Sequence, residues 1–274
     1  MLAIFKREFK SYFQNVIGWL FVAALLAVYG LYFYVYNLKN GYPYISYDLN
    51  GIGFIMMIAV PILTMRSLSD EKKTKTDQLM LTSPVSVGRI VAGKYFAMAA
   101  VYTIVIALFA LSPLVLSIYG KVALSEAYVA LFGYWLYGLS CIAVGLFISS
   151  ISESVIISAI LTFAALFLSY MMQSITGLIS SSGNLLTKVL NCFDLYTPFE
   201  NFVSGCFSVT SAAYYVTVIL LLCFLTTQSI QKRRWAFSKK MIGTGAFSAG
   251  MIVVMCAISV SYTHLRAHET SAHL

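Results

Sequence analysis

Charged residues and histidines are scarce in this sequence. Only 10% of its 274 residues are charged, and all three histidines fall within the last 14 residues. A Ser-His-Asp or Cys-His catalytic set needs a histidine beside its nucleophile, so the main part of the chain offers no such set. The five cysteines show no C-x-x-C spacing, which leaves no indication of a metal site. We therefore expect a protein that is not an enzyme and holds no cofactor or metal of its own.

Ionisable residues are also missing from the centres of the long apolar runs. One such residue costs about 2.5–3.5 kcal/mol at the centre of a membrane helix. Proton- and sodium-coupled transporters keep them because their mechanism uses them. Their absence disfavours an ion-coupled secondary carrier and predicts that energy for any transport enters from outside the bilayer.

Long apolar runs make up most of what remains. Hydrophobic residues account for 60% of the chain, and the mean hydropathy is +0.84. A run of about 20 such residues crosses the roughly 30 Å hydrocarbon layer. We predict an all-α polytopic membrane protein with six spans and a seventh after them; the second run is short and is extended back through Asp48. The runs are Val16–Tyr36, Ile52–Met65, Tyr95–Ile118, Tyr128–Ile151, Val155–Met172, Ala212–Ile230 and Met241–Val260.

The basic residues are concentrated on one side of this predicted topology. Three segments, Lys6–Lys10, Arg66–Lys94 and Lys232–Lys240, hold 14 of the 18 lysines and arginines. Basic loops stay in the cytoplasm, so the N-terminus of this multi-pass protein is predicted to be cytoplasmic. The net charge of +8 then reflects topology, and nucleic acid is not an expected partner.

Two further segments are amphipathic. Residues Met1–Trp19 alternate aromatic and basic positions at helical spacing, which predicts a helix along the membrane surface, in contact with lipid. A simple anchor and a docking element explain it equally well. The external segment Gln173–Ser211 is too apolar for an ordinary loop and predicts short helices at the outer face, partly re-entrant.

The longest cytoplasmic loop, Arg66–Lys94, combines charge with an apolar cluster. Its DEKKTK run is followed closely by Leu79-Met80-Leu81 and then by Ser83-Pro84, where the proline suits the first turn of a new helix. A charge run alone is usually a solvated face. Charges followed by Leu-Met-Leu instead predict a short amphipathic helix that binds a partner.

The stretch GRIVAGKY, Gly88–Tyr95, fits the G-x-x-x-x-G-K core of a phosphate-binding loop. A working loop also needs a preceding buried strand, a Ser or Thr after the lysine, and a helix N-terminus facing the phosphates. Tyr95 occupies the Ser/Thr position, and the segment runs directly into a predicted span. We interpret Gly88 and Gly93 as sites of close helix packing, with Lys94 extending to the cytoplasmic boundary.

The cytoplasmic loop resembles that of type-2 ATP-binding-cassette (ABC) exporter permeases. The family pattern is an acidic-basic cluster, a Thr, a Leu-rich turn, Thr/Ser-Pro-Val and then Gly-Lys, and DEKKTKTDQLMLTSPVSVGRIVAGKYF follows it in order. KREFKSYF, AVGLFISSISES and LYTPFENFVSGCFSV agree at three other places. The chain is most similar to gliding-motility-type permeases, although the usual Glu-Arg-Glu cluster is replaced by Asp-Glu-Lys-Lys.

This resemblance implies a multi-pass permease subunit of the bacterial plasma membrane. It also implies that the subunit pairs with a second copy or a paralogue and with separate ABC ATPase subunits, which carry ATP and Mg. It implies a coupling helix over Asp70–Leu81, with the N-terminal helix and the Ser149–Glu153 turn as further contacts. The residues expected to contact the ATPase are Asp70, Glu71, Lys72, Lys73, Thr76, Asp77, Leu79, Leu81 and Glu153.

The chain divides into three predicted parts. Residues 1–240 form the six-span permease domain, and residues 241–260 form the seventh span, the start of an auxiliary membrane domain. Residues 261–274 change abruptly in character and are expected not to be native. The main alternative to an exporter subunit is a membrane scaffold or sensor with the same fold that transports nothing.

Overall fold

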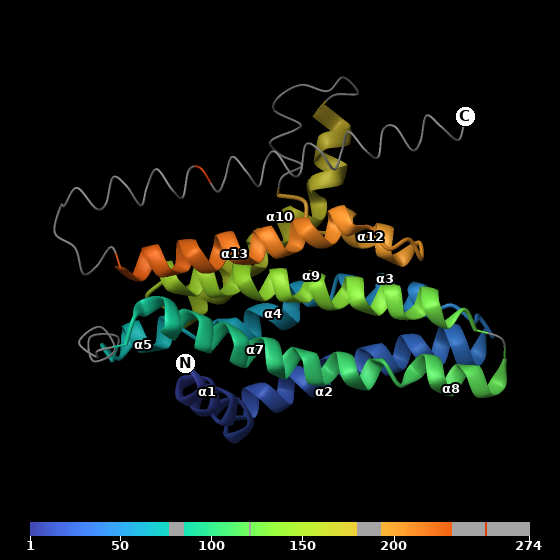
Figure 1. Cartoon of the computed structure of the whole chain (residues 1–274), viewed down its shortest axis with the longest axis horizontal. Helices are drawn as coiled ribbons and strands as arrows, with labels where there is room; N and C mark the ends of the chain where they lie inside the picture. Colours follow the sequence, from blue (N-terminus) through green and yellow to red (C-terminus); the bar gives the residue numbers. More distant parts are fainter. Residues whose placement is uncertain (77–84, 121, 180–192, 232–249, 251–274) are drawn as a thin grey trace.

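The computed structural model describes residues 1–76, 85–120, 122–179 and 193–231, together with Gly250. Every regular element within these ranges is a helix, as predicted (Figure 1). The elements are α1 (Leu2–Gln14), α2 (Val16–Phe33), the π-helix η1 (Tyr34–Lys39), α3 (Ile45–Gly53), α4 (Met56–Thr64), α5 (Ser69–Lys73), α7 (Val87–Phe109), α8 (Ser112–Tyr119), α9 (Leu124–Ile151), α10 (Val155–Ile179), α12 (Thr197–Val203) and α13 (Val209–Gln231).

Five of the described helices are long and apolar enough to cross a membrane, and a sixth span results if the bent pair Ile45–Gly53 and Met56–Lys73 counts as one. These correspond to the six predicted runs. The third begins at Val87 rather than at Tyr95 and continues through α8. The predicted seventh span, residues 241–260, lies outside the described residues apart from Gly250.

The second span differs from the prediction because it is broken. Its two halves meet at an angle of 59°, and around the break backbone N–H groups bond three residues back, as from Ile55 to Ile52 (3.0 Å) and from Ile58 to Ile55 (3.0 Å). Tyr196 packs against the end of α3, where a Cβ at Gly53 would lie 2.9 Å from its ring. The tertiary contact and the tighter turn together account for the change of direction.

Helix α9 is the centre of the bundle and contacts α3, α4, α7, α10, α12 and α13. Its glycines mark two of the closest approaches: a Cβ at Gly138 would lie 2.3 Å from the ring of Tyr102, and one at Gly145 would lie 2.3 Å from Thr64 Oγ1. The Tyr102 hydroxyl donates to the carbonyl of Tyr134 at 2.8 Å. Small residues therefore let α7 and α4 pack closely on α9, as in other membrane bundles.

The bundle has two distinct ends in Figure 1. Helix α5 and the start of α7 lie at the end that also holds α1 and the N-terminus, which we call the basal end. Helices α3, α8 and α12 lie toward the other, distal end. Helix α12 confirms a short helix in the predicted segment 173–211; its Phe199 and Phe202 are fully buried, whereas residues 180–192 are outside the description.

Candidate functional site

The basal end contains a buried ion cluster centred on Lys94. This lysine lies on the second turn of α7, and its side chain is 2% exposed. Its Nζ is 2.6 Å from Glu71 Oε1 and 3.2 Å from Glu8 Oε1, and it donates to the carbonyl of Ser67 at 2.9 Å. The expectation that Lys94 extends to the membrane boundary was therefore wrong, because two carboxylates hold its ammonium inside the protein.

Helix α1 brings Glu8 to this cluster. A Cβ at Gly93 would lie 3.0 Å from the Ile4 side chain, so this glycine lets α1 lie closely along α7, as the sequence predicted for this position. Phe9 packs on the core from the same helix. Sequence reasoning missed Glu8, although its position gave a signal: it lies four residues after Ile4 and so falls on the apolar face of the amphipathic helix.

The backbone between α4 and α5 is hydrogen-bonded to the end of α9. The Ser149 hydroxyl accepts hydrogen bonds from the backbone N–H groups of Leu68 and Ser69, both at 3.1 Å. Lys72 Nζ donates to the carbonyl of Ser150. The Ser149–Glu153 turn, predicted as a second contact with the partner, thus also holds α5 in place within the chain.

The predicted coupling residues separate into an inner and an outer set. Glu71 points inward to Lys94, and Lys72 bonds to the end of α9. Asp70 and Lys73 are exposed, as are Thr76 and Glu153. Asp77, Leu79 and Leu81 lie outside the described residues.

Glu71 lies on α5, and its carboxyl is largely buried beside Lys94. Its second oxygen, Oε2, is buried without a described hydrogen-bond partner. The carboxyl therefore depends on Lys94 for its charge compensation, and a change at either residue should affect the other.

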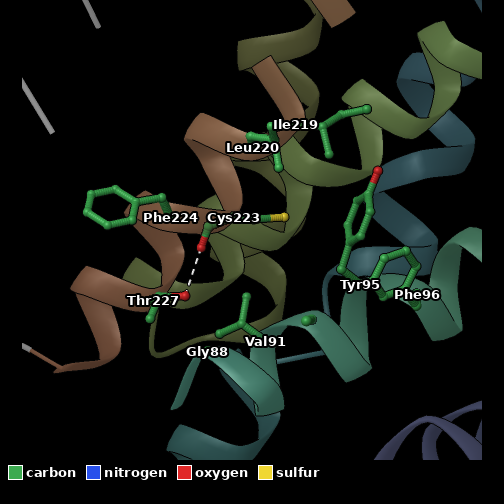
Figure 2. Close-up of a pocket in the computed structure, with 10 residues that line it drawn as sticks. Gly88, Val91, Tyr95, Phe96, Ile219, Leu220, Cys223, Phe224 and Thr227 are labelled. Carbon is green, nitrogen blue, oxygen red and sulfur yellow. Dashed lines mark hydrogen bonds between the residues drawn. The ribbon is translucent and has the colours of Figure 1, made fainter. Parts of the chain in front are cut away.

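The GRIVAGKY segment is part of continuous helix α7 and forms no loop. It lines one side of a cavity of about 240 Å³ between α7 and α13, and none of the lining residues is charged. Figure 2 shows Tyr95 and Phe96 on one side and Cys223 and Thr227 on the other, with the Thr227 hydroxyl donating to the Cys223 carbonyl at 2.9 Å. An apolar surface of this kind does not bind phosphate. The interpretation of the two glycines as sites of close helix packing is confirmed for Gly93 and wrong for Gly88, because a Cβ at Gly88 would lie 3.9 Å from its nearest neighbour, Thr227, and the residue lines the cavity.

A larger apolar cavity of about 530 Å³ lies between α9, α10 and α13. Its lining is almost entirely hydrophobic, with Ser169 and Tyr214 as the polar members. The Ser169 hydroxyl already donates to the Phe193 carbonyl (2.7 Å) and accepts from the Leu195 N–H (3.0 Å). The cavity therefore presents apolar surface and few free polar groups.

The sequence model described as "ABC-2 family transporter protein" matches residues 27–230. The chain belongs to the ABC-2 family of transporter proteins. It is accordingly a membrane permease component of an ABC transporter, and a non-enzymatic transport subunit fits that family. The match runs from within α2 to the end of α13 and includes Glu71 and Lys94, whereas Glu8 precedes it. No curated protein and no solved structure matches the chain significantly.

Proposed function

We propose that this ABC-2 protein is the membrane-spanning subunit of an ATP-driven exporter and that α5, with the loop after it, couples the bundle to a separate ATPase subunit. The observation that carries the proposal is the division of α5 into two faces. Glu71 is bound inside to Lys94, while the side chains of Asp70 and Lys73 are exposed. A segment fixed on one side and exposed on the other is suited to transmit force from a partner.

The ion cluster links this segment to two other helices. Lys94 on α7 bonds to Glu71 and to Glu8 on α1, and Ser149 ties the backbone before α5 to α9. Separating a buried ion pair leaves an uncompensated charge, which costs about 3–5 kcal/mol. Movement of α5 by an ATPase would therefore move the ends of α1, α7 and α9 with it, and the bundle would tilt as a unit.

The same proposal assigns the basal end to the cytoplasm of a bacterium. The exposed cations Arg66, Lys73, Lys75 and Arg89 lie beside or within α5 and in the first turn of α7, as expected for loops that remain inside. A second copy or paralogue would complete the translocation path, and ATP and Mg would be held by the ATPase. We also propose the gliding-motility-type branch, with 1–240 as permease domain, 241–260 as the start of an auxiliary domain and 261–274 as a non-native tail.

The coupling role is tested by reversing charges on the outer face of α5. The permease is purified from its native membranes, and the co-purified protein is checked by mass spectrometry for an ATPase with Walker motifs. Combined Asp70→Lys and Lys73→Glu substitution should weaken ATPase binding at least about tenfold, because like charges placed opposite each other in an interface cost several kcal/mol. Glu126→Lys reverses an exposed charge at the start of α9, at the other end of that helix from Ser149, and should leave binding unchanged.

Equal ATPase binding by both variants and the wild type would contradict the docking surface. Transport is tested separately in vesicles that contain the permease and its ATPase. Binding of an ATPase without any substrate-stimulated ATP turnover would instead support the scaffold or sensor alternative.

A further inference from the structure

We propose that Asp48 binds a proton in the folded protein and forms a neutral acid–amide pair with Asn37, which holds the distal end of the first span against the broken second span. Asp48 lies on α3 and is fully buried, and Asn37 lies on η1 and is 5% exposed. The Asn37 Nδ2–H group donates to Asp48 Oδ2. No part of the ABC transporter function assigned above uses this pair.

The remaining oxygens of the pair are the first argument. Asp48 Oδ1 and Asn37 Oδ1 are both buried, and neither has a hydrogen-bond partner within the described residues. Both are acceptors if Asp48 is ionised, so they cannot satisfy each other. A proton on Asp48 Oδ1 turns that atom into a donor. The Asn37 side chain, which already donates to Asp48 Oδ2, offers its amide oxygen as the acceptor.

The surroundings of Asp48 are the second argument. Among the described residues of the helices with the main contacts to α3, Lys39 of η1 is the only cation, and its side chain is exposed. Helix α2 contributes the buried phenol of Tyr29 and the phenol of Tyr32, whose ring packs on Gly51 of α3. Helix α9 contributes Tyr134, α12 carries Glu200, and α4 has no titratable residue. A buried carboxylate without a counter-cation costs several kcal/mol, and such a group normally neutralises instead.

Asp194 provides a contrast within the same chain. It is also buried, with 6% of its surface exposed, but its Oδ1 accepts from the N–H groups of Tyr196 (2.9 Å) and Thr197 (3.0 Å), and its Oδ2 accepts from the Thr197 hydroxyl. Hydrogen bonds of this kind stabilise the ionised form. The two buried aspartates therefore differ in their hydrogen bonds: both oxygens of Asp194 accept, whereas Asp48 Oδ1 has no partner within the described residues.

The position of the pair gives it a structural role. Asn37 belongs to a π-helical turn, an irregularity that is frequent at functional sites. Asp48 lies on α3, the half of the second span that precedes the 59° break. The proton comes from water, and its binding forms one O–H bond without any other covalent change. Loss of the proton would place an unpaired negative charge between η1 and α3 and would favour their separation.

Infrared difference spectroscopy of the purified full chain at neutral pH tests the proposal. The spectrum of wild type minus Asp48→Asn should show the loss of one protonated-carboxyl C=O band, whereas wild type minus Asp194→Asn should show the loss of carboxylate bands. Asn is the neutral isostere of a protonated Asp, so Asp48→Asn is expected to fold. Asn37→Leu removes the amide partner and should shift the protonated band without removing it, which provides a second readout.

Two results would overturn the proposal. One is the finding that no protonated-carboxyl band of the wild type at neutral pH changes on Asp48→Asn or Asn37→Leu substitution. The other is a band that disappears when sodium replaces choline in the buffer, which would identify the two oxygens as a cation site.

Discussion

Replacement of Lys94 by methionine should destabilise the folded bundle strongly. The substitution keeps a long apolar side chain but removes the ammonium that lies 2.6 Å from Glu71 Oε1 and 3.2 Å from Glu8 Oε1. Those carboxylates are only 20% and 15% exposed, so water does not take over the role of the lysine. Removing one partner of a buried pair costs about 3–5 kcal/mol, and the loss should fall in this range.

The comparison with Arg7 makes this prediction specific. Arg7 Nη2 lies 3.0 Å from the same Glu8 oxygen, but its side chain is 66% exposed. Exposed ion pairs contribute about 0–1 kcal/mol, so Arg7→Gln should change the free energy of unfolding by no more than that. The measurement is reversible unfolding in mixed micelles, followed by circular dichroism for both variants.

A further variant separates the ion cluster from packing. Glu8→Gln and Glu71→Gln added to Lys94→Met remove both uncompensated charges, and replacing a whole buried ion cluster by neutral groups is often nearly neutral. The triple variant should therefore recover most of the lost stability. The reasoning is refuted if Lys94→Met is as stable as Arg7→Gln, or if the triple variant is no more stable than Lys94→Met.

Two other predictions concern the contacts of α9. Ser149→Ala leaves two buried N–H groups without an acceptor, and each unsatisfied group costs about 1–3 kcal/mol. This variant should lose coupling while ATPase binding persists. In the control Ser150→Ala the lost hydroxyl bonds within its own helix at 2.6 Å, so full ATPase stimulation should be retained. Gly145→Ala places a Cβ 2.3 Å from Thr64 Oγ1, and this overpacking should lower the free energy of unfolding by about 1–3 kcal/mol. In the control Gly30→Ala the new Cβ meets no atom within 4 Å, so the melting curve should be unchanged. Loss of coupling in both serine variants, or equal melting of both glycine variants, would contradict the respective argument.

The spans were predictable because bilayer thickness imposes a length and an apolar composition on each of them. The break in the second span was not, because it depends on where Tyr196, distant in sequence, packs against α3. The short helix α12 followed from the apolar spacing of the segment. The role of Asp194, whose carboxyl accepts from the N–H groups of Tyr196 and Thr197 at the start of this helix, became visible only in the structure.

The candidate site was predicted from the sequence as a coupling helix over Asp70–Leu81, and its binding role stays a prediction. The structure has helix α5 over Ser69–Lys73, which ends earlier than the predicted helix, and it shows that Asp70 and Lys73 are exposed. The ion cluster could not be read from spacing, because Glu8 reaches Lys94 only when α1 lies along α7. The sequence also predicted that Glu71 contacts the ATPase, because its pairing with Lys94 inside the chain is visible only in the structure.

Photo-crosslinking from Lys73 tests the central claim most directly. A photoreactive amino acid replaces Lys73 on α5 in one variant and Tyr119, which is 80% exposed at the end of α8, in the other. The account predicts a crosslink between Lys73 and an ATPase with Walker motifs in native membranes, and none from Tyr119. A co-purifying ATPase that crosslinks to Tyr119 but not to Lys73 would contradict the assignment of α5 as the coupling element.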